Sequence, residues 1–273
     1  NEKCGAGKAT GVRHVGVHLL HQGHRVAFLD LDLRQRSRAR FFSNRRQWAQ
    51  ANGKTLPQAF EPFLHARPAE LLNAPEAEAK AAFDRALEEA LDGADYVIID
   101  TPGGDHALSR RAHAAAHVIV TPMNDSFVDF DLLGEVDPVT LDVKRPSIYA
   151  ETVWNSRKIR AVWDGKSIDW IVLRNRLAQL EARNRRRVDE RVQALGRRVG
   201  FEVLAGLRDR VIYRELFPFG LTVADLSDDI NPVAMSLGHV SARQELRALM
   251  ASLGLDESGD DMGVPADLET EEA

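Results

Sequence analysis

The sequence lacks the features that would place it outside a reducing cytoplasm. A single cysteine, Cys4, excludes an internal disulfide and fits a reducing compartment. No apolar run approaches the roughly 18 residues that a membrane-spanning helix needs, and no secretory signal peptide is visible. Internal repeats are also missing. We therefore expect a cytoplasmic protein without membrane insertion.

The composition is that of a globular chain with one acidic end. Hydrophobic residues make up 44% of the 273 residues, enough for a substantial core in one large α/β domain or two small ones. The net charge of −5 is uneven, because residues 255–273 hold eight acids and no Lys or Arg. We expect this segment to be a disordered acidic tail, since it has few apolar residues to bury.

Apolar, β-branched-rich runs alternate with helical patterns along the chain. We expect strands at 25–29, 96–99, 118–121, 170–173 and 201–204, and helices at 10–22, 37–51, 77–91, 177–199 and 241–253. Such alternation predicts a mostly parallel twisted sheet with helices on both faces. Ser241 and Glu245 stand near capping-box spacing at the start of the last helix. Segments 54–75 and 144–166 are expected to be loops or short insertions.

The first ten residues resemble a phosphate-binding loop. Glycines let backbone N–H groups close around phosphate oxygens, a Lys reaches the β/γ-phosphates, and a following hydroxyl binds Mg²⁺. Gly5, Gly7 and Lys8 are in place. A buried strand normally precedes such a loop, and none precedes Asn1. We therefore expect the given sequence to begin after that strand, which would be the first of the sheet.

Two positions of this loop depart from the usual pattern. Ala9 stands where the metal-binding hydroxyl belongs, and Thr10 cannot replace it, because one residue along a helix turns the side chain by about 100°. Cys4 puts a side chain where glycine normally allows close backbone approach. Two interpretations stay open: natural drift in a weakened phosphate-binding loop, or engineered knock-out changes.

Two expected strands end in carboxylates. The run 25–29 is followed by Asp30 and Asp32, and the run 96–99 by Asp100 and then Thr-Pro-Gly-Gly. Ligands bind outside the carboxyl ends of parallel strands, so Asp32 and Asp100 should face the phosphates of the loop. A carboxylate directly after four apolar strand residues is typical of a Walker B element, which holds Mg²⁺ through water.

The combination resembles the deviant Walker A ATPases of the ParA/MinD family, and within it the MipZ division-site regulators. The resemblance covers residues 1–254, which we take as one P-loop ATPase domain. Further segments that carry it are 29–36, 121–131, 172–176 and 207–225. It implies a bacterial ATPase that is slow and dimerises on ATP, binds DNA without sequence preference, inhibits FtsZ assembly and is recruited to the pole by ParB. Two alternatives stay open: a ParA-type partitioning ATPase, and a nucleotide-binding module with impaired hydrolysis.

The resemblance also assigns roles to single residues. Lys3 would be the signature lysine that crosses to the partner's phosphates, Lys8 would hold the β/γ-phosphates in its own subunit, and Asp32 would orient the attacking water. Mg²⁺ would be held by Asp32 and Asp100. ATP would be bound by Gly5, Ala6, Gly7, Lys8, Ala9, Thr10, Asn175 and Arg176, the last two at the adenine.

Residues 171–215 are the basic region of the chain, with twelve Arg, no Lys and six acids. Arginines fall along one flank of an apolar stripe in the helix expected at 177–199, and more follow it. Arginine without lysine favours phosphate binding, and the missing aromatic platform favours duplex DNA bound without sequence preference. The structural alternative is a solvated helix edge. The predicted DNA-binding residues are Arg183, Arg187, Arg191, Arg198, Arg208, Arg210 and Arg214.

The remaining polar clusters are expected to be structural. His14 and His18 have a zinc-like spacing of four, but no Glu or Cys follows at ligand distance, so we expect packing or surface roles. Asp125, Asp129 and Asp131 match the family run and are expected in a loop near the dimer face.

Overall fold

The structure is a computed structural model of the chain, and it describes residues 7–32, 37–60, 74–102, 106–124, 133–136, 143–175, 182–233 and 236–255. In chain order its elements are α1 (Lys8–His21), β1 (Val26–Asp30), α2 (Ser37–Ala51), α4 (Glu76–Gly93), β2 (Tyr96–Asp100), α5 (Ala107–Ala115), β3 (Val118–Asn124), β4 (Gly134–Val136), β5 (Val143–Pro146), α7 (Ile148–Asp164), β6 (Asp169–Asn175), α8 (Ala182–Val199), β7 (Glu202–Ala205), α9 (Ile212–Glu215), a 3₁₀ turn η1 (Phe217–Phe219) and α10 (Leu237–Ser252).

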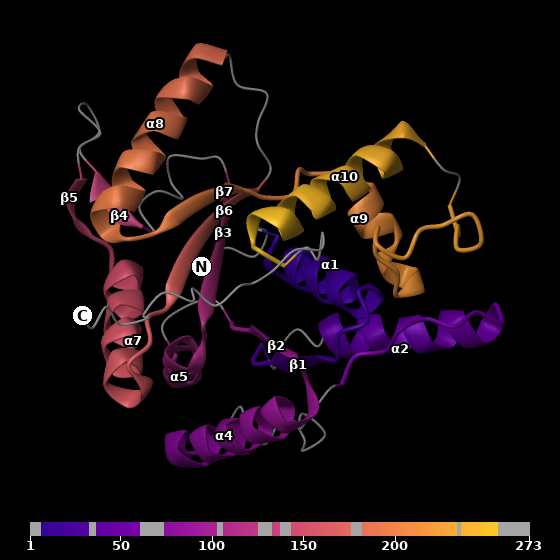
Figure 1. The fold of residues 1–273 in the computed structure, drawn as a ribbon, viewed down its shortest axis with the longest axis horizontal. Helices are drawn as coiled ribbons and strands as arrows, with labels where there is room; N and C mark the ends of the chain where they lie inside the picture. The colour runs from indigo at the N-terminus through magenta and orange to yellow at the C-terminus, as the bar shows by residue number, and fades with distance from the viewer. Residues whose placement is uncertain are drawn as a thin grey trace, which may run out of the picture.

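The strands form two parallel groups and one hairpin. β1 pairs with β2, and β6 lies between β3 and β7, all in parallel. β4 and β5 pair antiparallel. Helices surround both parallel groups, as Figure 1 shows. The α/β class with parallel strands and helices on both faces is therefore confirmed.

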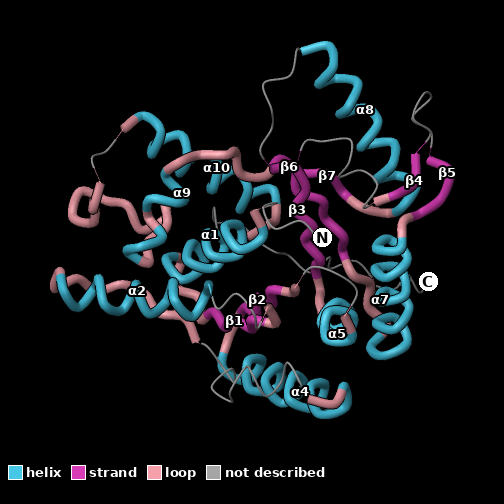
Figure 2. Tube along the Cα trace, turned by 180° about the vertical axis from the view of Figure 1, so that it is seen from behind, coloured by secondary structure: helices cyan, strands magenta, loops and turns pink. Residues whose placement is uncertain are grey.

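β1 and β6 are buried on both faces, which explains their near-continuous apolar runs. Phe28 of β1 packs with α1, α2 and α10 in the largest core cluster, whereas its neighbour Leu29 packs with α4 and α5. β6 divides in the same way. Ile171 joins the largest cluster, and Trp170 packs with α7 and α8. The view from behind in Figure 2 shows α4 beside β1 and β2, away from α8.

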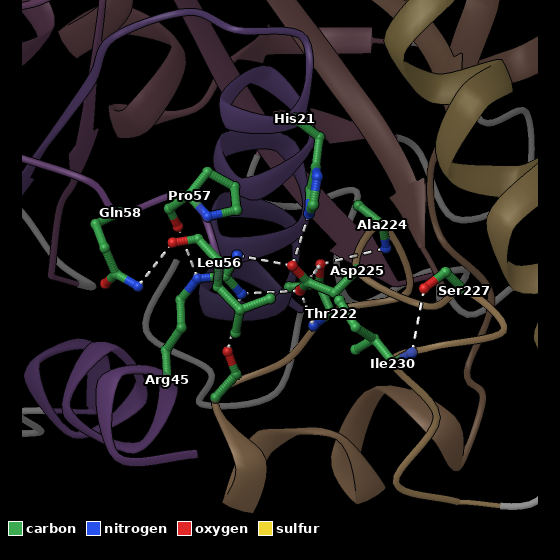
Figure 3. Close-up of polar contacts among 11 residues, drawn as sticks. His21, Arg45, Leu56, Pro57, Gln58, Thr222, Ala224, Asp225, Ser227 and Ile230 are labelled. Atoms are coloured by element: carbon green, nitrogen blue, oxygen red, sulfur yellow. Dashed lines mark hydrogen bonds and ion pairs between the residues drawn. The ribbon is translucent and has the colours of Figure 1, made fainter. Parts of the chain in front are cut away.

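A buried ion pair fastens α1 and α2 to the segment after η1 (Figure 3). Arg45 of α2 and Asp225 are each 0% exposed, and Arg45 Nη1 and Nη2 donate to the two carboxylate oxygens at 2.9 and 2.7 Å. His21 Nε2 at the end of α1 lies 2.7 Å from Asp225 Oδ1, and the backbone N–H of Thr222 donates to Oδ2. Gly220 must lack a side chain here, because a Cβ would lie 2.0 Å from the backbone nitrogen of Arg45.

Within the described residues the helix and strand expectations hold with small shifts, and two expectations are wrong. Residues 177–181 of the helix expected at 177–199 lie outside the described residues. Residues 144–166 are not loops, because they form most of β5 and all of α7. α7 buries one face, which includes Val153 and Ser156. Helical capping by Ser147 and Gly165 at its ends was the missed signal. The last helix begins at Leu237 rather than 241, because Ser236 and His239 form the capping box.

That earlier start leaves Glu245 in the middle of α10, where it binds other residues. The first helix was expected to end at residue 22, and α1 does end beside Gly23, whose left-handed φ of +93° is typical of the glycine after a helix. Among the described residues, none of the helices has the length and apolar character needed to cross a bilayer.

Candidate nucleotide site

α1 begins at the end of the predicted phosphate loop. Gly7 caps the helix with a left-handed φ of +83°, a conformation that favours glycine, and its carbonyl accepts the N–H of Gly11 at 2.8 Å. Lys8, Ala9 and Thr10 form the first turn and are half-buried. The N–H groups of this turn have no earlier helical carbonyl to bind, which makes a helix N-terminus suited to anions. Lys3, Cys4, Gly5 and Ala6 lie outside the described residues.

Asn175 lies between the start of α1 and the parallel group formed by β3, β6 and β7. It ends β6 and is buried. A Cβ at Gly7 would lie 2.8 Å from Asn175 Nδ2, so the loop approaches this amide more closely than any other residue type would permit. On its other side, Asn175 Oδ1 accepts the backbone N–H of Leu207 at 2.9 Å. The Asn175 side-chain amide thus contacts Gly7 at the start of α1 and Leu207 in the segment after β7. Arg176, the other residue predicted to contact adenine, lies outside the described residues.

The two predicted carboxylates lie at the carboxyl ends of neighbouring strands. Asp30 and Asp100 end β1 and β2 in register, and Leu31 N–H donates to the Asp100 carbonyl at 2.9 Å. Asp32 follows two residues later, with its N–H bonded to Asp30 Oδ1 at 3.0 Å. Asp32 and Asp100 therefore share one edge of the molecule, as expected from parallel pairing.

The residues present fit a nucleotide with a reduced set of metal ligands. Asn175 Nδ2 lies where a Cβ at Gly7 would have to be, so only glycine lets the start of α1 lie against this amide. Asp32 and Asp100 can hold a hydrated Mg²⁺, but Ala9 in the first turn of α1 offers no oxygen. Within the described ranges, no group of three or more His, Cys, Asp or Glu side chains could hold a metal ion.

The histidine expectation is confirmed for His14. Its ring is 2% exposed, Nδ1 lies 2.9 Å from the Thr10 carbonyl, and the ring packs edge-on against Tyr213 with centroids 4.8 Å apart. Burial lowers the pKa of His14 to about 4, although its hydrogen bond to Thr10 opposes this. His14 is therefore a neutral packing residue on the buried side of α1.

The predicted DNA-binding arginines differ in exposure, and three of them form ion pairs. Arg198 of α8 is exposed. The side chains of Arg208 and Arg214 are 61% and 69% exposed, although Arg208 Nε lies 3.4 Å from Glu245 Oε1 and Arg214 Nη2 lies 3.7 Å from Asp209 Oδ1. Arg210 is only 23% exposed and is bonded to Glu245. Arg183, Arg187 and Arg191 lie in α8, but their side chains are outside the described part of the structure. Asp125, Asp129 and Asp131 are also outside it.

Sequence reasoning missed three residues around Asn175. Asn124 ends β3 and pairs in register with Asn175. Gly206 lies against the other side of the amide, since a Cβ there would be 2.0 Å from Asn175 Oδ1. Glu245 binds the segment that follows Gly206. The position of Asn124 at the end of a mostly apolar strand was a usable signal, whereas Gly206 and Glu245 depend on contacts distant in sequence.

Solved structures with the same arrangement are ATPases of the ParA/MinD type. An ATP complex of Cyanothece McdA is similar with a TM-score of 0.55 and 14% identity, over 95% of this chain and 96% of that chain. The MinC:MinD complex of Aquifex aeolicus gives a TM-score of 0.51 at 13% identity, over 95% and 96%. A putative plasmid partition protein of Borrelia burgdorferi B31, bound to AMPPNP, gives 0.51 at 10% identity, over 92% and 96%.

At these identities the solved structures establish the fold, which is that of a ParA/MinD-type P-loop ATPase. No curated protein matches the chain. The family comparison is more specific, because the family described as ATPase MipZ matches residues 1–257, nearly the whole chain. The chain belongs to the MipZ ATPase family.

Proposed function

We propose that this protein is an ATP-gated dimeric switch that positions the division plane of a bacterial cell. Its ATP-bound dimer would bind duplex DNA without sequence preference, inhibit FtsZ assembly and be recruited by the ParB–centromere complex. The protein would act in the cytoplasm, on the nucleoid and at the cell pole. The observation that carries the nucleotide part is the contact of Gly7 with Asn175 at the start of α1. Family membership supports the division part.

Each residue near the site has a defined task in this proposal. Gly5, Ala6, Gly7 and Lys8 would surround the phosphates, Thr10 would touch the α-phosphate, and Asn175 with Arg176 would contact adenine. Asp32 would orient the water that attacks the γ-phosphate. Mg²⁺, when bound, neutralises phosphate charge, and Asp32 and Asp100 would hold its water shell.

The loop composition predicts weakened ATP binding that two substitutions should restore. Ala9→Ser adds a metal ligand and Cys4→Gly removes a side chain near the phosphates. Hydrogen bonds to charged groups contribute about 1.5–3 kcal/mol each, so the double variant should bind Mg²⁺-ATP one or two decades more tightly and hydrolyse it faster. Titration calorimetry and phosphate release measure both effects. Lys8→Ala is the negative control, and a double variant with unchanged binding and turnover would disprove this loop assignment.

The second lysine of the loop should act between subunits. In this proposal Lys8 binds the phosphates of its own subunit, so the positive charge of Lys3 would be neutralised only by a phosphate bound to the partner. Lys3→Ala should therefore keep nucleotide binding but lose ATP-dependent dimers, whereas Asp32→Ala should accumulate dimers by blocking water attack. Light scattering with a slowly hydrolysed ATP analogue measures both. Normal dimers in the Lys3→Ala protein would remove the trans role.

The DNA proposal predicts a uniform loss of affinity from α8. Replacing Arg187 and Arg191 with Ala should weaken binding to every duplex alike and flatten its salt dependence, because fewer counterions are released. Anisotropy with duplexes of different sequence measures this. Arg85→Ala, exposed on α4, is the matched control and should bind like the parent. Strong sequence preference, or unchanged binding in the double variant, contradicts the proposal.

Two alternative functions have specific support. The similarity to a putative plasmid partition protein favours a partitioning ATPase, and FtsZ sedimentation separates the two: a division regulator reduces pelleted FtsZ when ATP is present, and a partitioning ATPase does not. Ala9, in the first turn of α1, favours a nucleotide-binding module with impaired hydrolysis. That module would bind ATP without releasing phosphate.

A further inference from the structure

Glu245 of α10 makes a concentrated set of contacts with the segment after β7. Arg210 donates to both carboxylate oxygens, from Nη2 at 2.5 Å and from Nε at 3.1 Å. The backbone N–H of Arg208 and the hydroxyl of Tyr213 each donate to Oε2 at 3.4 Å. The side chain of Glu245 is 18% exposed and that of Arg210 is 23% exposed, so water screens this pair only in part.

The same segment is held at its other end by the residues of the nucleotide site. Gly206 N–H donates to the Arg174 carbonyl at 3.0 Å, and Leu207 N–H donates to Asn175 Oδ1 at 2.9 Å. No side chain fits at Gly206, because its Cβ would collide with Asn175 Oδ1. Residues 206–210 are therefore fixed between Asn175 on one side and Glu245 on the other.

Fixing this segment also fixes the amide of Asn175. While Leu207 donates to Oδ1, the carbonyl end of the amide points toward residue 207, and its NH₂ end lies toward Gly7. If the segment moved away, Oδ1 would lose this partner and the amide could rotate. A base that is recognised by donor and acceptor position would then be recognised less well.

The carboxylate of Glu245 is charged at neutral pH. Burial would raise its pKa, but the hydrogen bonds and positive charges of Arg210 and Arg208 together outweigh burial, and the pKa lies below its usual value. The anchor is therefore a charge-assisted pair rather than a neutral hydrogen bond, and replacing Glu245 with the isosteric Gln removes the charge without changing the volume.

We propose that Glu245 is a positioning residue for the nucleotide base: through Arg208 and Arg210 it holds Gly206 and Leu207 against Asn175. This inference rests on the proposed function, in which Asn175 lies at the base. Glu245 itself touches no nucleotide. Its effect should therefore appear in base discrimination and not in the binding of the phosphates.

The test compares nucleotides that share phosphates and differ in the base. We expect Glu245→Gln and Arg210→Gln each to weaken ATP binding about tenfold in titration calorimetry and to reduce the preference for ATP over GTP. Inorganic tripolyphosphate, which has no base, should bind the variants and the parent equally. Gln244→Ala, an exposed neighbour on α10, is the matched control and should keep both the affinity and the preference. The exchange variant Glu245→Arg with Arg210→Glu should regain part of the preference.

Several results would overturn the inference. An unchanged ATP:GTP ratio in Glu245→Gln would reduce Glu245 to a stabilising ion pair. A rise in DNA affinity with that ratio unchanged would mean that Glu245 neutralises Arg208 and Arg210 instead. If Glu245→Gln does not fold, hydrogen exchange of the parent decides: ATP should slow exchange of the 207–210 amides, and no slowing refutes the idea. A parent that binds no ATP overturns the proposed function and this inference together, whereas an ATP affinity that falls in Lys8→Ala but stays unchanged in Glu245→Gln overturns the inference alone.

Discussion

Asp225→Ala should cost the protein a large part of its stability. The carboxylate accepts two bonds from Arg45 and lies 2.7 Å from His21, and neither Arg45 nor Asp225 has solvent exposure (Figure 3). Removing it leaves the Arg45 charge buried without its carboxylate, which costs about 3–5 kcal/mol in comparable pairs. Since native domains are stable by about 5–15 kcal/mol, urea unfolding followed by circular dichroism should show a far lower midpoint.

The matched control is the ion pair of Arg25 with Asp95, which has a similar distance of 2.6 Å but lies at the surface. Asp95→Ala should barely move the midpoint, because water and salt already solvate both groups. A double replacement, Arg45→Met with Asp225→Leu, should recover much of the loss, since it leaves no buried charge. Equal effects at Asp225 and Asp95 would contradict the role of burial.

The same pair makes the protein sensitive to strong acid. Burial alone would raise the pKa of Asp225, but the hydrogen bonds from His21 and Arg45 outweigh it and lower the pKa to about 2. The unfolded carboxyl titrates near 3.9, so this contribution is complete above about pH 4 and is lost as the pH falls towards 2.

His14 should make stability decline at much milder acidity. Burial lowers its pKa to about 4, whereas the unfolded imidazole titrates near 6.5. Between these values the unfolded chain takes up a proton that the folded chain does not, so the free energy of unfolding falls as the pH drops from about 6.5 to 4. A difference of about 2.5 pH units corresponds to about 3 kcal/mol.

The measurement is urea unfolding at pH 7, 5.5 and 4.5. His14→Phe keeps a ring against Tyr213 but cannot titrate, so it should lose this part of the decline, with a roughly constant cost for the missing bond to Thr10. His106→Gln, exposed before α5, should decline like the parent. If His14→Phe and the parent decline in parallel, His14 is not the group responsible.

Local sequence patterns were sufficient for the elements that carry the candidate nucleotide site. Asp100 ends β2, as the strand pattern predicted, and α1 begins at Lys8, two residues before the helix expected from the sequence. α2 was predicted with its observed bounds, Ser37–Ala51. These features follow from interactions over a few residues, which a single sequence displays directly.

Tertiary structure alone decided which charged groups meet. Arg210 and Glu245 are separated by 35 residues, and Arg45 and Asp225 by 180, and no local pattern indicates either pair. Arg210 was predicted to face DNA, and Glu245 to stand near a helix cap, yet the packing of α10 beside the segment after β7 brings them together. The sequence by itself determined the nucleotide-binding fold, because glycines and strand ends act locally. Only the tertiary structure decided which arginines and carboxylates form ion pairs, because burial and contacts between distant parts of the chain set the energies of those pairs.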